Sequence, residues 1–345
     1  MAIIYGLIVG LRNLLFDWKI LPSEKFSLPV ISVGNLSAGG TGKTPHVEYL
    51  IRLLSGSYKV SSLSRGYGRR TSGFIAAAEK DNATSIGDEP MQYLKKFDSL
   101  GVFVDENRRR GIKNILKKSP ETRVILLDDA FQHRYVKPGL SILLTDYHKL
   151  YYNDYLLPSG TLREPILGAG RADIIIVTKT PTVLSPIVRR KIVTDLKPKS
   201  HQKVYFSFIR YNKIQSLWKS DCSFIPEKKY SHILLFAGIA NPYPLQDQLQ
   251  KYCNELTTIQ FSDHHQYTLA DLEWIDKKFN DLYSRNKLLV TTEKDAMRLI
   301  NPEIMEKAVQ LPVHYLPIEV DFHNGDKSDF DEQILKYVNK NQRER

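Results

Sequence analysis

The chain has 345 residues, of which 42% are hydrophobic and 25% charged, and its net charge is +11. This composition is that of a globular protein, which argues against a mainly disordered chain. The length allows two domains, or one large α/β domain with an appendage. The excess of positive charge favours an anionic partner, such as a nucleotide, a nucleic acid or an acidic membrane. Charge by itself does not select among these three.

An apolar segment opens the chain. Residues 2–16 carry no positive charge ahead of the apolar run, unlike a signal peptide, and the run is shorter than the roughly 20 apolar residues of a membrane-spanning helix. The hydrophobic residues follow helical spacing and form one stripe: Ile3, Ile4, Leu7, Ile8, Leu11, Leu14, Leu15 and Trp18. Two interpretations stay open: a helix packed on its own domain, or a helix in the plane of a membrane surface with Trp18 and Lys19 at the interface.

Predicted strands alternate with predicted helices over the next part of the chain. Apolar runs predict strands at residues 29–33, 59–63, 74–77, 102–104, 123–127, 140–144 and 173–177. Helical patterns lie between several of them, at residues 44–54, 89–97, 106–117 and 185–196. This alternation predicts a mostly parallel sheet with helices on both faces, which binds its ligands at the carboxyl ends of the strands.

The pattern changes after residue 203. Residues 203–210 are aromatic and alternating, residues 214–218 form a second short run, and a polar stretch follows, which indicates a β-ribbon or linker. A second α/β set comes next, with strands predicted at 232–236, 257–261, 288–291 and 313–320 and helices at 243–253, 269–283 and 328–340. We therefore predict an N-terminal helix over 1–20, a P-loop domain over 21–215, a linker over 216–230 and a smaller C-terminal α/β domain over 231–345.

The strongest motif lies between the first predicted strand and the first predicted internal helix. Its residues are Ser37, Ala38, Gly39, Gly40, Thr41, Gly42, Lys43 and Thr44. Glycines let the backbone turn its N–H groups around a polyphosphate, and the helix that follows points its positive end there. Lys43 would contact the β- and γ-phosphates and the Thr44 hydroxyl would bind Mg²⁺. The strict P-loop pattern has glycine where this chain has Ser37.

A pair of carboxylates follows the apolar run 124–127. Asp128 and Asp129 end that predicted strand, and a P-loop is usually accompanied by an acidic residue on a neighbouring strand that serves the magnesium shell. Successive strand residues point to opposite faces, so both carboxylates can serve the site only if the strand ends there. The residues that follow, up to Gln132 and His133, are consistent with a loop.

Two further segments carry candidate proton-transfer groups. Asp88 and Glu89 stand at the start of a predicted helix, where the helix dipole favours acids, and Asp88 is a candidate base for a hydroxyl acceptor. Asp263, His264 and His265 precede Thr268, a capping residue of the next helix, and therefore lie on a loop. A histidine–aspartate pair there could assist proton transfer across an interdomain cleft.

A basic loop completes the set of candidate groups. Arg65 and Arg69 flank Tyr67 in a Gly-Tyr-Gly turn, which is suited to clamping an anionic group. The segment 291–296, Thr-Thr-Glu-Lys-Asp-Ala, ends a strand at the same cleft, although spacing does not reveal its chemistry.

Taken together, these motifs resemble the lipid A 4′-kinases, the tetraacyldisaccharide 4′-kinase family of Gram-negative bacteria. The matching segments are VGNLSAGGTGKTP (33–45), SRGYGRR (64–70), GDEP (87–90), DDAFQHR (128–134), LLPSGTLREP (156–165), GRAD (170–173), FSDHHQY (261–267) and TTEKDA (291–296). Their order along most of the chain is more specific than any single motif, and Ser37 is expected within this family. The fold implied is P-loop NTPase-like, with a smaller C-terminal α/β domain joined by a two-stranded linker.

The resemblance implies transfer of the γ-phosphate of ATP to the 4′-hydroxyl of a tetraacylated glucosamine disaccharide 1-phosphate, which gives lipid IVA. Asp88 would deprotonate the acceptor, helped by Asp263 with His264, or with His265 in its place, and Lys43 would act on the phosphates. Asp128 and Asp129, with Thr44, would hold Mg²⁺. Candidate contacts to the acceptor are Arg65, Tyr67, Arg69, Glu89, Gln132 and Arg171.

The resemblance also implies a location and partners. The N-terminal helix would anchor the protein peripherally to the cytoplasmic face of the bacterial inner membrane, and the partners would be the lipid A disaccharide precursor and that lipid surface, with no nucleic acid and no obligate protein partner. The alternatives are a P-loop GTPase-like factor or an ATPase assembly factor. Residues 177–181, Val-Thr-Lys-Thr-Pro, lack the aspartate of a guanine-reading Asn-Lys-x-Asp, and the chain has no recognisable nucleic-acid-binding module.

Overall fold

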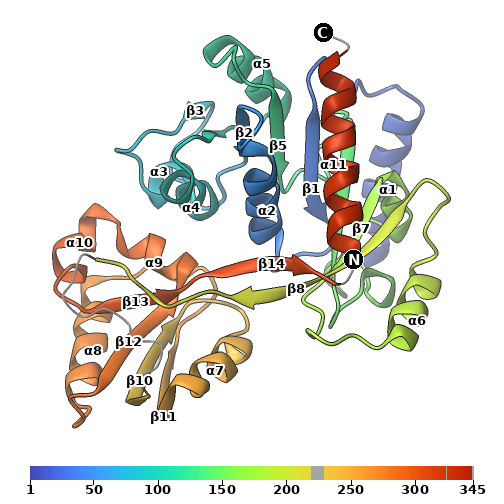
Figure 1. Ribbon diagram of the computed structural model, residues 1–345. Helices are drawn as coiled ribbons and strands as arrows, with labels where there is room; N and C mark the ends of the chain where they lie inside the picture. The colour runs from blue at the N-terminus through green and yellow to red at the C-terminus, as the bar shows by residue number, and fades with distance from the viewer. Residues whose placement is uncertain (219–228, 324, 344–345) are drawn as a thin grey trace.

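The computed structural model describes residues 1–218, 229–323 and 325–343, and within them the chain forms two units, each built on its own β-sheet (Figure 1). In the described residues the larger sheet has nine strands in the order β14-β8-β7-β6-β1-β5-β2-β4-β3. The strands are β1 (Val30–Asn35), β2 (Val60–Ser64), β3 (Ile75–Ala76), β4 (Gly101–Val104), β5 (Val124–Asp128), β6 (Leu140–Asp146), β7 (Ile174–Thr178), β8 (Lys203–Tyr211) and β14 (Ile318–Phe322). The predicted mostly parallel α/β sheet is confirmed.

The interior strands of this sheet pair in parallel, and the two edge strands, β3 and β14, run antiparallel to their neighbours. Strands β1, β5 and β7 are buried along their whole length because helices cover both faces. On one face lie α2 (Lys43–Ser55) and α11 (Asp326–Arg343), and on the other lie α5 (Arg108–Lys118) and α6 (Pro186–Leu196) (Figure 1). Burying each large aliphatic side chain of such a core contributes about 1.5–3 kcal/mol.

Several helices begin where local chemistry favours it. Asn107 accepts a hydrogen bond from the Arg110 N–H and caps α5, and Ser185 caps α6, whose first residue is a proline. The short α3 (Ala83–Ile86) has a capping box, and α4 (Asp88–Lys96) follows it directly. Two 3₁₀ turns, Tyr151–Asn153 and Ile166–Arg171, lie in the connection between β6 and β7.

The smaller unit contains a five-stranded sheet in the described residues, in the order β11-β10-β12-β13-β9. Its strands are β9 (Gln215–Ser216), β10 (Tyr230–Ala237), β11 (Cys253–Gln260), β12 (Lys287–Thr292) and β13 (Val313–Leu316). Its helices are α7 (Tyr243–Leu249), the 3₁₀ turn Gln250–Tyr252, α8 (Leu269–Asn280), α9 (Glu293–Leu299) and α10 (Pro302–Ala308). The predicted cap of α8 is confirmed, since Thr268 and Asp271 form a capping box. Helices α9 and α10 were not predicted.

Two strands pass between the units. β8 leads from the larger sheet into β9, and the chain returns from β13 into β14 through Pro317, with Tyr211 paired antiparallel to Ile318 and Ser207 to Phe322 (Figure 1). The single strand predicted over 313–320 is therefore two strands, separated at a proline that has no N–H to donate to a ladder. This ribbon lies before the predicted linker at 216–230, of which residues 219–228 lie outside the described residues.

The C-terminal segment belongs to the larger unit, which corrects the domain predicted over 231–345. β14 extends the nine-stranded sheet, and Phe330, Ile334 and Val338 of α11 are buried in the same core as Ile31 and Leu54. These three residues of α11 are four positions apart, so they line one face of the helix. The apolar stripe of α11 needs a partner surface, and the larger sheet supplies it.

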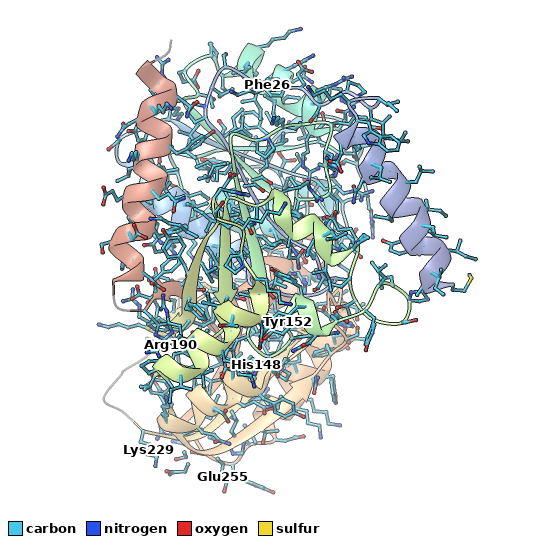
Figure 2. All side chains as sticks on the ribbon, turned by 90° about the vertical axis from the view of Figure 1, so that its right-hand side faces the viewer. Phe26, His148, Tyr152, Arg190, Lys229 and Glu255 are labelled. Atoms are coloured by element: carbon cyan, nitrogen blue, oxygen red, sulfur yellow. The ribbon has the colours of Figure 1, made fainter. Side chains whose placement is uncertain are left out.

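The predicted N-terminal helix is α1 (Ala2–Asp17), which packs along one side of the larger unit, across the sheet from α11 (Figure 2). Of its side chains, Phe16 is buried, Tyr5 donates a hydrogen bond to the Arg163 carbonyl at 2.7 Å, and Asn13 donates one to Glu164 at 3.0 Å. The large apolar side chains of the other face are exposed: Ile3, Ile4, Leu7, Ile8, Leu11, Leu14 and Trp18. No helix among the described residues is long and apolar enough to cross a membrane.

Candidate functional site

The P-loop connects β1 to α2 at the carboxyl end of the sheet. Gly42, directly before α2, has a φ of 85°, a left-handed conformation that favours glycine, and Gly39 has a φ of 117°. No side chain in the described part of the chain caps α2, so its first N–H groups face the loop without a side-chain acceptor. This is the arrangement in which a helix N-terminus receives a phosphate.

The departure at Ser37 has a structural explanation. Ser37 forms an antiparallel bridge with Leu162 and is buried, and its φ is negative, so this position needs no glycine. The bridge continues on both sides: Ala38 N donates to the Thr161 carbonyl at 2.7 Å, and Arg163 N donates to the Leu36 carbonyl at 2.7 Å. The segment 161–163 thus holds the first half of the P-loop in place.

The two adjacent aspartates after β5 have different surroundings. Asp128 is buried and its Oδ2 accepts a hydrogen bond from the Tyr93 hydroxyl at 2.9 Å, while its Oδ1 has no hydrogen-bond partner among the described residues. Asp129 has a φ of 47° and turns toward Arg163, whose Nη1 lies 3.1 Å from both carboxylate oxygens. Lys43 Nζ lies 3.6 Å from Asp129 Oδ1. Both aspartates therefore lie at the P-loop, as predicted, because the strand ends at Asp128.

The pKa values of these carboxyls move in opposite directions. Burial, followed by the negative charges of Glu89 and Asp129, raises the pKa of Asp128 to about 6. For Asp129 burial also acts upward and is the largest single effect, but the charges of Lys43 and Arg163 together outweigh it and lower the pKa. Asp129 is thus held ionised by its partners, whereas Asp128 carries a charge that the protein itself does not neutralise.

Asp88 is the first residue of α4, at a close contact between two loops. Gly87, with a φ of 96°, packs against Gly66, and a Cβ on Gly87 would lie 3.0 Å from the Gly66 backbone, so the Gly-Tyr-Gly turn approaches the start of α4. Oδ2 of Asp88 accepts hydrogen bonds from Arg298 Nε at 3.0 Å and Nη2 at 2.7 Å, and His264 Nδ1 lies 3.4 Å away. Both Arg298 and His264 come from the smaller unit, so the site spans the two units.

The pKa of Asp88 reflects these contacts. Burial is the largest single effect and raises the pKa of the carboxyl, but the hydrogen bond with His264 and the charge and hydrogen bonds of Arg298 overcome it and lower the pKa to about 2. Asp88 is therefore ionised at every pH at which a protein normally works. It is a weak base and a strong hydrogen-bond acceptor.

The structure distinguishes the two histidines. His264 faces Asp88, and its Nε2 lies 3.3 Å from Lys294 Nζ. Its Nδ1 also lies 3.4 Å from Arg298 Nη2, so the His264 ring lies between two cationic donors, Lys294 and Arg298, beside the Asp88 carboxylate. His265 instead pairs with Asp271 at 3.0 Å and stacks on Phe261, in the interior of its own unit. Of the two histidines that the sequence left open, His264 is therefore the one beside Asp88.

Some of the other predicted residues lie near Asp88 and His264, and others support the loops around them. Tyr67 is exposed with its ring 5.5 Å from that of His264, and Arg65 is also exposed. Glu89 pairs with Lys294 at 3.1 Å beside them. Asp263 is exposed and makes no hydrogen bond to Asp88.

Three predicted acceptor contacts already have protein partners. The side chain of Arg69 is 3% exposed and forms an ion pair with Glu106. Arg171 pairs with the buried Glu164 at 2.8 Å, and Gln132 donates to the same carboxylate at 3.1 Å. A charge that is already paired is a poor anchor for an anionic ligand, so we reassign Arg69 and Arg171 to the support of the loops that carry the site.

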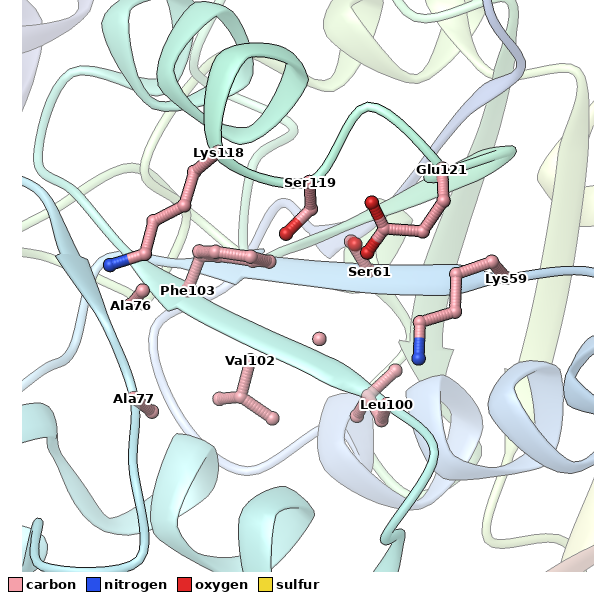
Figure 3. Close-up of a pocket in the computed structure, with 11 residues that line it drawn as sticks. Lys59, Ser61, Ala76, Ala77, Leu100, Val102, Phe103, Lys118, Ser119 and Glu121 are labelled. Atoms are coloured by element: carbon pink, nitrogen blue, oxygen red, sulfur yellow. The ribbon is translucent and has the colours of Figure 1, made fainter.

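A separate pocket lies at the opposite, amino end of the strands (Figure 3). Its volume is about 240 Å³ and it is lined by Lys59, Ser61, Ala76, Ala77, Leu100, Gly101, Val102, Phe103, Lys118, Ser119 and Glu121. None of the predicted site residues is among these. Ligands of parallel α/β sheets bind at the carboxyl ends of the strands, where the P-loop and Asp128 lie.

The sequence was compared with known proteins. A sequence model of the family described as tetraacyldisaccharide-1-P 4′-kinase matches residues 1–339. The chain belongs to this kinase family. Two relatives, each named tetraacyldisaccharide 4′-kinase, are 46% identical: that of Bacteroides thetaiotaomicron over 99% of this chain and 92% of its own length, and that of Flavobacterium johnsoniae over 99% and 96%.

A solved structure agrees with this kinase family. The chain is similar to the crystal structure of LpxK from Aquifex aeolicus in complex with ATP, with a TM-score of 0.73 and 27% sequence identity, over 98% of this chain and 97% of that one. The fold of the kinase family thus extends over both units of this chain.

Sequence reasoning on this kinase missed several residues at the site. Arg298 and Lys294 contact Asp88, His264 and Glu89, and Arg163 contacts Asp129. One pattern could have revealed Arg298: an arginine within the apolar run Ala-Met-Arg-Leu-Ile, three residues after Asp295. Residues three apart share a helix face, and a charge placed in a buried face needs a partner.

Proposed function

We propose that this protein transfers the γ-phosphate of ATP to the 4′-hydroxyl of a tetraacyldisaccharide 1-phosphate and thereby forms lipid IVA. One observation carries the proposal beyond family membership: helix α4 links the P-loop side of the sheet to an ionised carboxylate that Arg298 holds. Tyr93 of α4 donates to Asp128 at the P-loop, and Asp88 begins the same helix. The donor site and the candidate acceptor site are therefore joined by one short helix.

On this proposal the residues around the P-loop hold ATP. The free N–H groups at the start of α2 bind the phosphates, and Lys43 adds its positive charge next to them. Arg163 and Asp129 keep Lys43 directed to the loop, since Asp129 bonds Arg163 and lies 3.6 Å from the lysine. These groups position the phosphate that is transferred and stabilise its charge, which is the main contribution of protein to phosphoryl transfer.

The residues present fit a magnesium ion. Oδ1 of Asp128 is buried with no partner among the described residues, and the raised pKa of this carboxyl, caused by burial and by neighbouring negative charge, marks a site that favours a cation. Asp128 and the Thr44 hydroxyl would hold the ion, with Asp129 beside them. Magnesium would neutralise charge on the β- and γ-phosphates.

Asp88 serves the acceptor. Its Oδ2 is occupied by Arg298 and His264, and its Oδ1 makes no hydrogen bond to any described residue, so Oδ1 is available to the 4′-hydroxyl. The hydroxyl oxygen forms the new bond to the γ-phosphorus while the bond to ADP breaks, and its proton passes to Asp88. Because Asp88 is a weak base, it orients the hydroxyl first and takes the proton late, when the forming bond has made that proton acidic.

The experiment that tests this function follows labelled phosphate from ATP into a tetraacyldisaccharide 1-phosphate in detergent micelles with Mg²⁺. We expect transfer by the wild-type protein and a loss of at least about 100-fold in kcat for Asp88→Asn, with little change in the KM for ATP. Asp98→Asn, an exposed aspartate just beyond the same helix, is the matched control. Wild-type turnover in Asp88→Asn would remove Asp88 from the mechanism, and no transfer by the wild type would refute the function.

We further propose that α1 binds the protein to the cytoplasmic face of the inner membrane, where an acylated acceptor would reside. The support is the exposed apolar face of α1, formed by large side chains such as Ile3, which is 79% exposed, and Leu7, which is 68% exposed. An exposed apolar patch of this kind marks an interaction surface. The opposite face of α1 is bonded to Arg163 and Glu164, next to the P-loop, so the membrane surface and the site would be held at a fixed distance.

A further inference from the structure

The guanidinium of Arg298 is a buried charge with an unusual set of partners. Its side chain is 1% exposed. Nη1 donates to Asp295 at 2.7 Å and to the Gly238 carbonyl at 3.2 Å, both within the smaller unit. Nε and Nη2 donate to Oδ2 of Asp88, which belongs to the larger unit. One edge of the guanidinium is therefore bonded within the smaller unit, and the other edge is bonded to the larger unit.

The anchored edge is held by a network of its own. Oδ2 of Asp295 accepts hydrogen bonds from Gly238 N at 3.0 Å and from the Thr292 hydroxyl at 2.7 Å, while its Oδ1 faces Arg298. Thr292 also caps α9. These contacts all lie within the smaller unit. They hold the guanidinium of Arg298 in place there and direct its Nε and Nη2 toward the larger unit.

The Nε and Nη2 edge of Arg298 determines the orientation of the Asp88 carboxylate. The planar guanidinium can place two donors on one carboxylate oxygen, which fixes the position of that oxygen. Here both donors fall on Oδ2, and His264 approaches the same oxygen. The partner oxygen, Oδ1, is left for another donor. Without Arg298 the carboxylate of Asp88 would be free to rotate about its own side-chain bond.

We infer that Arg298 is a positioning residue for phosphoryl transfer: at the contact of α9 with α4, Arg298 holds Oδ2 of Asp88, so that Oδ1 faces the acceptor hydroxyl. This inference rests on the function proposed above. Two further ion pairs join the same helices, Glu89 with Lys294 at 3.1 Å and Lys96 with Glu293 at 2.7 Å. The orientation of the Asp88 carboxylate therefore depends on the contact between α4 and α9.

The charges around Asp88 determine what loss of Arg298 does to it. They are Glu89 on its own helix, Lys294, Asp295 and Arg298 on α9, and His264 on the loop before α8. Removal of Arg298 takes away the strongest positive partner and leaves the effect of burial, so the pKa of Asp88 rises. In the wild type Asp88 stays ionised through the working range, so protonation of Asp88 adds an acidic limb to the activity profile only in the Arg298 variants, a change that a purely structural role does not produce.

The test uses the full chain with Arg298 replaced by Ala, Gln or Lys. We expect kcat to fall at least about 100-fold for Arg298→Ala and Arg298→Gln, and about tenfold for Arg298→Lys, which keeps a charge but cannot form the fork. The KM for ATP should stay within about threefold, since the P-loop is in the other unit. The matched control is Glu303→Ala, which removes an exposed ion pair between the units, with Arg70, without touching Asp88.

Each outcome decides a separate question. A folded Arg298→Ala or Arg298→Gln protein with kcat near wild type, or without an added acidic limb, overturns the inference. If those two variants do not fold, the same two readouts on Arg298→Lys decide it. If the wild type transfers no phosphate, the proposed function fails. The grip on Asp88 is then measured directly by carboxyl carbon-13 NMR, with Asp88 assigned by its absence in Asp88→Asn: the same titration in wild type and Arg298→Lys overturns the inference.

Discussion

Asp128 and Asp129 are neighbours in the chain, yet the fold gives them separate tasks. Asp129, in a left-handed conformation, turns toward Arg163 and Lys43, and these charges lower its pKa. Asp128 stays in the buried strand end with one unpartnered oxygen and a pKa of about 6. Asp129 pairs with the charges next to the P-loop, and Asp128 keeps a buried oxygen without a partner among the described residues.

The raised pKa of Asp128 predicts that replacing this aspartate stabilises the fold, although it abolishes activity. The folded-state pKa of Asp128, about 6, exceeds the value near 4 of an unfolded chain, so wild-type stability falls as pH rises from about 4 to 6 and stays lowered above that. Asp128→Asn removes the penalty and still accepts from Tyr93. We expect the variant to be more stable by roughly 3 kcal/mol at pH 7 without divalent cations and equal to wild type below pH 4.

Denaturant unfolding at the two pH values measures this, together with the kinase assay, in which Asp128→Asn should be inactive. Asp98→Asn, an exposed aspartate, controls for the change in net charge. Equal stability of Asp128→Asn and wild type at pH 7 would contradict the view that Asp128 carries an unneutralised charge.

At the scale of an element, helix α1 packs one face against the protein and exposes an apolar face. Its polar contacts, made by Tyr5 and Asn13, are directed at Arg163 and Glu164. The rest of the helix carries large apolar side chains that no described residue covers. The helix is packed on its own domain and presents an apolar stripe outward, and binding of that stripe to a membrane surface stays a prediction.

Charges placed on that stripe test whether it binds lipid. Leu7→Glu with Leu11→Glu should greatly reduce sedimentation of the protein with vesicles of inner-membrane lipids, because each charge costs about 2–3 kcal/mol of transfer into lipid. Activity on a short-chain, micelle-dispersed acceptor should stay close to wild type, since Tyr5 and Asn13 keep their contacts. Ile187→Glu, at an isoleucine of α6 that is 77% exposed, is the matched control. Undiminished vesicle binding by the double variant would place the anchor elsewhere.

At the scale of the whole molecule, three helices from both units meet at one charged cluster. Lys96 of α4 lies 2.8 Å from Glu48 of α2 and 2.7 Å from Glu293 of α9. Both carboxylates are buried, and Glu48 also accepts from Gln92 at 2.8 Å. Burial is the main cause that raises the pKa of Glu48, and the charge of Lys96 opposes it. Lys96 thus bridges two buried negative charges across the interface between the units, and Arg52 adds a second positive charge 3.5 Å from Glu48.

Loss of that lysine should loosen the contact between the units. Lys96→Met removes the ion pair with Glu293 and leaves Arg52, 3.5 Å from Glu48, as the remaining cation of the cluster. The loss of stability should therefore be smaller than the value of about 3–5 kcal/mol typical of a fully buried pair. We expect a destabilisation of roughly 2 kcal/mol at pH 7 that shrinks as pH falls and Glu48, whose pKa is raised, protonates. Lys95→Met, an exposed neighbour on the same helix, should change stability by less than about 0.5 kcal/mol. A Lys96→Met protein as stable as Lys95→Met would show that the cluster does not join the units.

The sequence by itself determined what is encoded by neighbouring residues. The P-loop from Ser37 to Thr44, the end of β5 at Asp128 and the cap of α8 at Thr268 follow from glycine content, apolar runs and local hydrogen bonds, which involve residues only a few positions apart. The order of motifs also sufficed to place the chain in its kinase family. A phosphate-binding loop that ends in Gly42-Lys43-Thr44 needs little else to be recognised.

The tertiary structure decided the relations between distant residues. It placed His264 rather than His265 beside Asp88, brought Arg298 to the same carboxylate, and returned α11 to the first sheet. The sequence pattern does not name the partner in any of these contacts. The partner of Asp88 depends on how the two units pack, and the apolar stripe of α11 does not by itself reveal which sheet covers it. Local chemistry specifies the P-loop, and packing between the units specifies the surroundings of Asp88.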